Sequence, residues 1–102
     1  MWIPTLIANF IGLPTTLALS VTTARVALEA RTTYRVWSSV DCFIMFGDVT
    51  VEATTTSHPL TAKCELLYRT SATETYVAGI VSSGTGQLFI SKVAVKAAPW
   101  AL

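Results

Sequence analysis

The stretch that decides the fold is Tyr76–Val95, YVAGIVSSGTGQLFISKVAV. Two apolar runs rich in β-forming residues, Tyr76–Val81 and Gln87–Val95, flank the short segment Ser82–Gly86. Glycine tolerates positive φ angles, and a few Ser, Gly and Thr residues between two β-rich runs are typical of a hairpin turn. In the second run, successive side chains would point to opposite faces of a strand. The sequence therefore predicts a β-hairpin here, with the remaining strands arranged around it.

The rest of the chain is read as further short strands separated by turn residues. Leu17–Ala30 predicts one long or two short strands, because its Val and Thr residues favour strand over helix. One strand each is predicted at Thr33–Ser38, Cys42–Phe46 and Cys64–Thr70. Gly47–Ala62 predicts an exposed loop with a short strand at Val49–Ala53. About seven strands with turns between them and no long helix predict an all-β fold, a small antiparallel β-sandwich or barrel.

The chain is expected to consist of one domain with two apolar extensions. The predicted division is an N-terminal arm at 1–16, a β-domain at 17–95 and a C-terminal tail at 96–102. The arm lacks the basic start of a signal peptide, and its two prolines and Asn9 argue against a membrane span of about 20 apolar residues. Its apolar spacing also allows a short helical turn within Leu6–Ile11. The arm could fold back on its own domain or dock on a neighbouring subunit, and both alternatives stay open.

Composition points to a chain that associates with other proteins. Charged residues make up 13% of the sequence, against about 25% for an ordinary soluble domain, while apolar residues reach 52%. Large apolar patches on small domains usually mark interfaces, so we expect an obligate homo-oligomer. The net charge is +1 and the basic residues are dispersed, which argues against a nucleic-acid partner. Cys42 and Cys64 are expected to be buried thiols, although a single bridge stays open.

No pattern in the sequence groups the residues that catalysis would need. The motifs GxSxG, HExxH and the P-loop are absent, and the single histidine, His58, stands before a proline in a Thr-rich loop. Asp41, Asp48 and Glu52 lie close together but match no EF-hand spacing, so they are interpreted as surface charges. The expectation is a protein that is not an enzyme, with no catalytic residue, no cofactor and no metal site.

Several segments resemble a family of small virion proteins of tailed bacteriophages. These segments are DCFIMFG (Asp41–Gly47), EATTTSHPL (Glu52–Leu60), ELLY (Glu65–Tyr68) and TYVAGIVSSGTGQLFISKV (Thr75–Val93). The resemblance covers about residues 33–93 and departs from the family pattern at Thr61–Cys64, where Thr-Ala-Lys-Cys replaces a Pro-Ala-Gly type of turn. It implies a structural protein of the virion, most simply a head decoration or cement subunit, and it carries over no catalytic residue.

The resemblance and the apolar ends together give the functional expectation. We expect a β-sandwich that self-associates, as a trimer, and that docks on the major capsid protein or other virion proteins, without nucleic acid or membrane. The residues predicted to make oligomer or capsid contacts are the large apolar side chains of the two ends: Trp2, Ile3, Leu6, Ile7, Phe10, Trp100 and Leu102. The alternatives are a tail, neck or fibre-base component, or a receptor- or carbohydrate-binding module; a small membrane-active protein that uses the N-terminal arm is a third.

Overall fold

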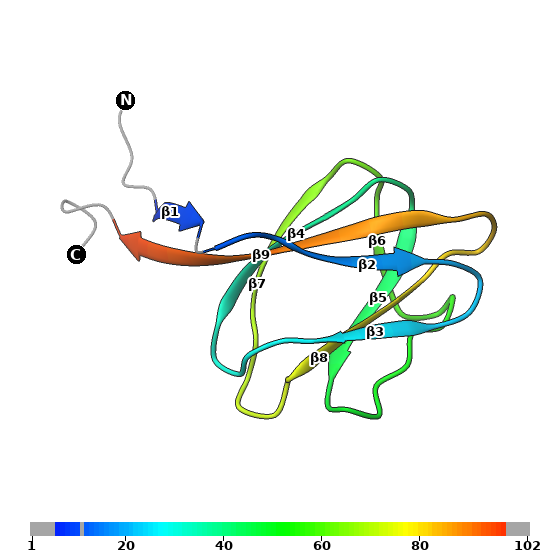
Figure 1. The fold of residues 1–102 in the computed structure, drawn as a ribbon, viewed down its shortest axis with the longest axis horizontal. Helices are drawn as coiled ribbons and strands as arrows, with labels where there is room; N and C mark the ends of the chain where they lie inside the picture. The colour runs from blue at the N-terminus through cyan, green and yellow to red at the C-terminus, as the bar shows by residue number, and fades with distance from the viewer. Residues whose placement is uncertain (1–5, 11, 98–102) are drawn as a thin grey trace.

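The computed structural model describes residues 6–10 and 12–97, and within them it is all-β (Figure 1). The described strands are β1 (Leu6–Phe10), β2 (Thr15–Leu19), β3 (Ala24–Ala27), β4 (Thr33–Ser38), β5 (Cys42–Gly47), β6 (His58–Leu60), β7 (Glu65–Arg69), β8 (Tyr76–Ile80) and β9 (Gly86–Ala97). None of the described segments forms a helix with the length and apolarity that crossing a bilayer needs.

The strands form two antiparallel sheets. In the first, called sheet A, β7 pairs with β4 and β4 pairs with β9, while β1 and β2 lie one after the other along the opposite edge of β9. In the second, sheet B, the order is β3-β8-β5-β6. The predicted all-β class is confirmed, and the architecture is a sandwich rather than a closed barrel.

The core lies between the two sheets because each strand alternates buried and more exposed side chains. In β4, for example, Tyr34, Val36 and Ser38 are buried, while Arg35 and Trp37 point to the opposite face of sheet A. The core cluster draws on both sheets and consists of Leu17, Leu19, Tyr34, Val36, Cys42, Ile44, Leu60, Val77, Val81, Leu88 and Ile90.

The predicted hairpin around Ser82–Gly86 is wrong. β8 belongs to sheet B, where it pairs with β3 and β5, whereas β9 belongs to sheet A. Both long edges of each strand are therefore occupied by other strands, and the connection carries the chain from one sheet to the other. Turn residues such as Gly84, with a φ of 75°, show that the chain reverses its direction. They do not show whether the next strand pairs with the previous one, as in a hairpin, or joins the other sheet.

Three other local predictions need correction. The helical turn within Leu6–Ile11 is wrong, because Leu6–Phe10 is a strand held by pairing with β9. The strand at Val49–Ala53 is absent, and the strand in this region is β6. Leu17–Ala30 divides into two short strands, β2 and β3, that belong to different sheets.

The two cysteines differ in exposure. Cys42 is buried in β5, as predicted, but Cys64 is exposed, contrary to the prediction, and both are free thiols. Burial raises the pKa of the Cys42 thiol, a hydrogen bond with Ser38 partly opposes that shift, and Asp41 adds to it. We therefore expect Cys64, and not Cys42, to react first with thiol reagents.

The loop after β5 is mostly exposed, as predicted, but Val51 and Ala53 pack against the outer side of sheet B. Ala53 is only 2% exposed, and its N–H donates to Thr23 Oγ1 over 2.8 Å. Arg25 donates to the carbonyl oxygen of Val51 over 3.4 Å, and a Cβ added at Gly47 would lie 2.9 Å from the Val51 side chain. Ala78, which faces outward beside Met45 and Arg25 in the strand register, is fully buried as a result.

Candidate assembly surface

The predicted contact residues fall at the two ends of the chain. Trp2, Ile3, Trp100 and Leu102 lie outside the described residues. For Leu6, Ile7 and Phe10 the structure describes the backbone, which belongs to β1. The prediction that these seven side chains make contacts stays a prediction, but the strand that carries three of them is now placed.

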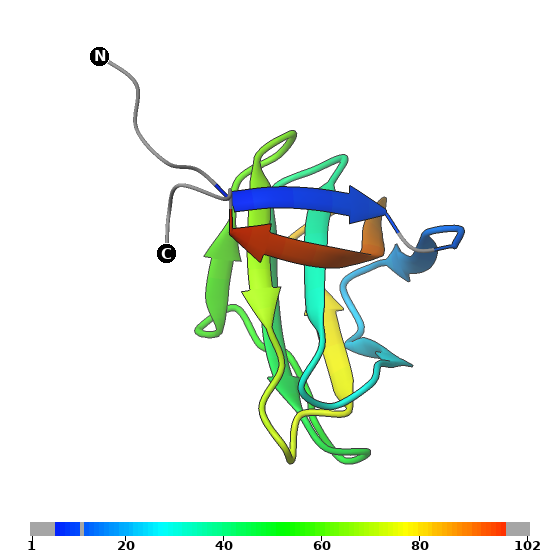
Figure 2. The ribbon, with the colours of Figure 1, turned by 90° about the vertical axis from the view of Figure 1, so that its left-hand side faces the viewer.

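The described parts of the two ends are paired with each other. β1 runs antiparallel to the last residues of β9, with Leu6 opposite Ala97 and Phe10 opposite Val93. We call β1 together with Val93–Ala97 the terminal ribbon. Figure 1 shows it extending sheet A away from the other strands, and in Figure 2 it crosses in front of the sandwich. The described parts of the arm and the tail, which the sequence suggested as separate extensions, therefore belong to one structural element.

The terminal ribbon is separated from the sandwich by an interruption along β9. Phe10 pairs with Val93 and Thr15 pairs with Ile90, so the two strands are four residues apart in sequence while their partners on β9 are two residues apart. Gly12 adopts a φ of 74°, which is costly for residues with a Cβ. Leu13 is 92% exposed. The ladder is thus broken between the ribbon and the sandwich, and the break presents an apolar side chain to solvent.

The outer face of sheet A carries an apolar patch that sequence analysis did not single out. Trp37 and Phe89 stand opposite each other on β4 and β9, with ring centroids 5.5 Å apart and planes tilted by 53°. Leu67 on β7 lies on the same face and is 52% exposed. An ion pair between Arg35 and Glu65 borders the patch. The alternation of TYRVWS could have identified it, since Trp37 falls on the face opposite Tyr34 and Val36.

The two outer faces of the sandwich therefore differ. The loop after β5 packs on sheet B. In the part of the chain that the structure describes, no comparable loop lies over Trp37, Phe89 and Leu67 on sheet A. Aromatic side chains on an exposed face are common in protein–protein interfaces. The outer face of sheet A and the terminal ribbon, which extends the same sheet, form the candidate assembly surface.

The edges of the sheets support this choice. An exposed strand edge can pair with another chain, and proteins commonly block such edges with charged residues or proline. β3 carries Arg25, β6 carries Pro59, and β7 carries Glu65 and Arg69. β1, with the sequence LIANF, carries neither a charge nor a proline. β2, with the sequence TTLAL, lies along the same edge of sheet A and is uncharged as well, so the edge formed by β1 and β2 is the one that the sequence leaves open to pairing.

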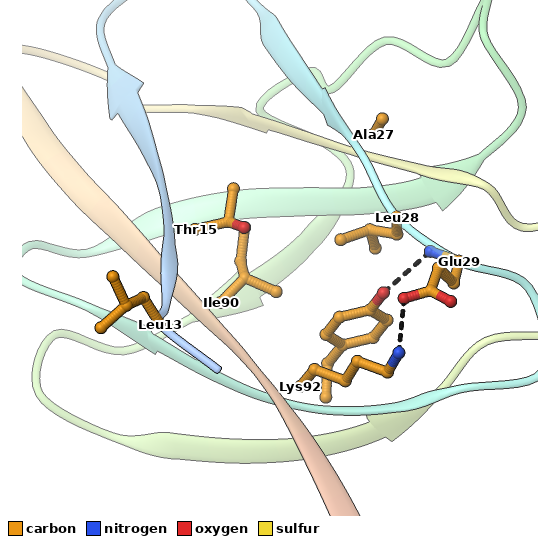
Figure 3. Close-up of a pocket in the computed structure, with 8 residues that line it drawn as sticks. Leu13, Thr15, Ala27, Leu28, Glu29, Ile90 and Lys92 are labelled. Carbon is orange, nitrogen blue, oxygen red and sulfur yellow. Dashed lines mark hydrogen bonds and ion pairs between the residues drawn. The ribbon is translucent and has the colours of Figure 1, made fainter. Parts of the chain in front are cut away.

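A pocket of about 320 Å³ opens between β2 and β3, but its polar groups already have partners. Figure 3 shows Leu13 and Thr15 on one side and Glu29 and Lys92 on the other. Lys92 Nζ and Glu29 Oε2 are 2.6 Å apart, and the hydrogen bond to Glu29 raises the pKa of the lysine. The Glu29 N–H donates to the Tyr34 hydroxyl over 2.8 Å. A polar ligand would have to displace these contacts.

A second pocket, of about 340 Å³, lies on the opposite side of the sandwich and contains His58. Phe46 and Tyr68 stack there with centroids 3.8 Å apart, and the Tyr68 hydroxyl donates to Glu74 Oε2 over 2.6 Å. Burial and this contact with Glu74 raise the pKa of Tyr68 to about 12. The remaining lining is mostly apolar, and His58 is exposed at the start of β6.

The acidic residues weighed as calcium ligands have local structural contacts. Asp41 accepts the Ala62 N–H over 2.7 Å, and Asp48 accepts from the N–H and hydroxyl of Thr50. The hydroxyl and amide of Thr50 lower the pKa of Asp48. In the part of the chain that the structure describes, no group of three or more His, Cys, Asp or Glu residues is placed to hold a metal ion.

Comparison with known proteins adds no relative. No family model, no curated protein and no solved structure matches this chain.

Proposed function

We propose that this chain is a structural protein of a tailed-bacteriophage virion, a head decoration or cement subunit. In this proposal, copies associate as a trimer through the candidate assembly surface, which includes the terminal ribbon, and the apolar chain ends reach onto neighbouring subunits and the major capsid protein. The role is one of assembly rather than catalysis, and it requires no cofactor. The protein would be part of the virion, which is assembled in the cytoplasm of the host bacterium.

The observation that carries the proposal is the terminal ribbon. It extends sheet A beyond the sandwich, and it is flanked in sequence by the most apolar ends of the chain, with Trp2 before it and Trp100 after it. Burial of apolar surface contributes about 25 cal/mol per Å², so a few such side chains could supply most of the binding free energy of a clamp. A subunit that reinforces a shell needs such a projecting element to reach its neighbours.

The family resemblance is consistent with a sandwich that serves as the framework and chain ends that make the contacts. The matching segment Asp41–Gly47 forms β5, Glu65–Tyr68 lies in β7, and Thr75–Val93 contains β8 and most of β9. These strands contribute to both sheets, so the segments that resemble virion proteins build the framework of the sandwich. The ends that would bind the shell lie outside the match.

The test is co-sedimentation of the purified chain with empty heads of the phage that encodes it. The double variant Trp2→Ala/Phe10→Ala should bind at least about tenfold more weakly, because large aromatic anchors at interfaces each contribute more than about 1 kcal/mol. Its unfolding midpoint should stay unchanged. The matched control, Val21→Ala/Val49→Ala, removes two exposed apolar side chains away from the ribbon and should bind normally.

Wild-type affinity of the Trp2/Phe10 variant for heads would refute the clamp. Electron microscopy of particles bearing gold-labelled protein separates the remaining alternative within the virion, because label on the tail, neck or fibre base would replace the head assignment.

A further inference from the structure

We infer that β1 is exchanged between copies of this chain, so that β1 of one copy pairs with Val93–Ala97 of another. This inference concerns self-association alone and rests on that part of the proposed function. The partner is a second copy of the chain, and the contact is the β1–β9 register already seen within one copy. The exchange converts the terminal ribbon into the junction between subunits.

The first argument is that the ribbon is a separate unit. Among the described residues, β1 has β9 as its strand partner, and β4 leaves β9 at Val93, where the ribbon begins. The described core draws on β2, β4, β5, β6, β8 and β9. Moving β1 to another copy therefore leaves the sandwich strands and their register unchanged.

The second argument is energetic. A two-stranded antiparallel pair is marginally stable in water when no second layer covers it. Exchange keeps the same backbone pairing, so it loses no ladder contact, and it brings two copies together so that further apolar surface can be buried. The unblocked edge of β1 favours the same outcome, because it can accept a strand from the neighbouring copy.

The third argument is the connection between β1 and β2. Short hinge segments promote exchange when they hinder closure within one chain. Here four residues of sequence connect strands whose partners on β9 are only two residues apart, and the connection includes Gly12, at a φ of 74°, and Pro14. An added Cβ at Gly12 would meet no heavy atom within 4 Å, so the connection is not packed against the sandwich at this point. Opening this connection lets β1 swing away while β2 stays in sheet A.

The test is disulfide trapping between Ala8 and Val95, which stand directly opposite each other in the ribbon. Opposed residues in antiparallel strands have Cα atoms about 4.5–5.5 Å apart, within the range of a disulfide. All variants carry Cys64→Ser, because Cys64 is an exposed free thiol. Ala8→Cys is made in unlabelled protein and Val95→Cys in ¹⁵N-labelled protein; the two are refolded together from denaturant, oxidised, and analysed by mass spectrometry.

Exchange predicts a mixed disulfide between labelled and unlabelled chains as the main product. The control pairs Ala8→Cys with Thr55→Cys, an exposed loop position, and should give at least tenfold less mixed product. The double variant Ala8→Cys/Val95→Cys should run as covalent oligomers on a non-reducing gel. Two glycines inserted after Gly12 ease closure within one chain and should shift that variant towards an internally bridged monomer.

Two results would overturn the inference. One is a double variant that is bridged only within single chains, with mixed product no greater than in the control. The other is the absence of any disulfide between positions 8 and 95, which would mean that the pairing itself does not persist in solution. Binding to phage heads is measured separately. If the exchange is trapped but the protein does not co-sediment with heads, the virion role alone is refuted. If the protein co-sediments with heads but no exchange is trapped, the exchange alone is refuted.

Discussion

At the scale of single residues, Lys63 occupies a backbone conformation that suits glycine. Its φ is 60°, in the turn where its N–H donates to the Ser38 carbonyl oxygen over 2.8 Å. The left-handed region costs about 1–2 kcal/mol for a residue with a Cβ, and a glycine there avoids this cost. Glycine also has more conformational freedom in the unfolded chain, which offsets about 0.5–1 kcal/mol of the gain. We predict that Lys63→Gly raises the free energy of unfolding by up to about 1 kcal/mol in urea titrations. The neighbouring control, Ala62→Gly, should lower it; stabilisation by both would contradict the explanation.

Glu74 gives a second prediction at this scale, for pH dependence. Burial alone would raise its pKa, but hydrogen bonds from the Tyr68 hydroxyl and from Ser71 lower it below its ordinary value of 4.5. A carboxyl whose pKa is lowered on folding stabilises the folded state above its unfolded pKa, and that contribution disappears as the pH falls through its folded pKa. The stability advantage of the wild type over Glu74→Gln should therefore shrink as the pH falls from 6 towards about 3. Urea unfolding at several pH values measures it, and a constant difference would argue against this assignment.

At the scale of elements, the sequence predicted the positions of the strands better than it predicted which strands pair with each other. Thr33–Ser38 was predicted with the bounds of β4, and Cys42–Phe46 lacks only the last residue of β5. Alternation is local and shows which side chains share a face, but pairing depends on strands far apart in the sequence. The Ser82–Gly86 turn therefore suggested a hairpin where the chain changes sheets, and the helix-like spacing of Leu6–Ile11 could not show that β9 would hold this segment as a strand.

The same limit applies to the candidate assembly surface. The apolar character of both ends was evident from the sequence, but their union in one ribbon depends on a pairing between the first and last strands. The Trp37–Phe89 patch could have been found from alternation, yet its openness depends on which sheet the loop after β5 covers.

That loop gives the prediction at the element scale. The buried N–H of Ala53 donates to Thr23 Oγ1, so Thr23→Val would leave this donor without its acceptor at nearly constant side-chain volume. An unsatisfied buried donor costs about 1–3 kcal/mol, and we predict a loss of stability of that size with faster amide exchange at Ala53. Thr23→Ser keeps the hydroxyl and should restore most of the loss, while Thr22→Val, at an exposed position, should change stability by less than about 0.5 kcal/mol. A Thr23→Val variant as stable as the wild type, together with a loss of stability in Thr23→Ser, would show that the methyl group, not the hydrogen bond, holds the loop.

At the scale of the whole molecule, the sandwich and the terminal ribbon divide stability and association between them. The sandwich has a core formed by both sheets and a loop that packs on part of the outer face of sheet B. The ribbon adds strand pairing outside that core, on the sheet whose outer face stays open. A molecule built this way should lose association before it loses its fold when its N-terminal end is shortened.

Deletion of residues 1–10 tests this division directly. The shortened chain keeps β2 to β9 and every residue of the described core, so it should fold cooperatively, with a thermal midpoint near that of the full chain at low protein concentration. Size-exclusion chromatography with light scattering should show an oligomer for the full chain and a monomer for the shortened one. Deletion of residues 1–16 is the contrasting variant. It also removes Thr15 and Thr16, which pair with Ile90 and Phe89, so it should destabilise the sandwich itself. If the chain without residues 1–10 formed an oligomer with the same number of subunits as the full chain, association would have to be assigned to the Trp37–Phe89 face alone. The terminal ribbon would then be excluded as a contact between subunits.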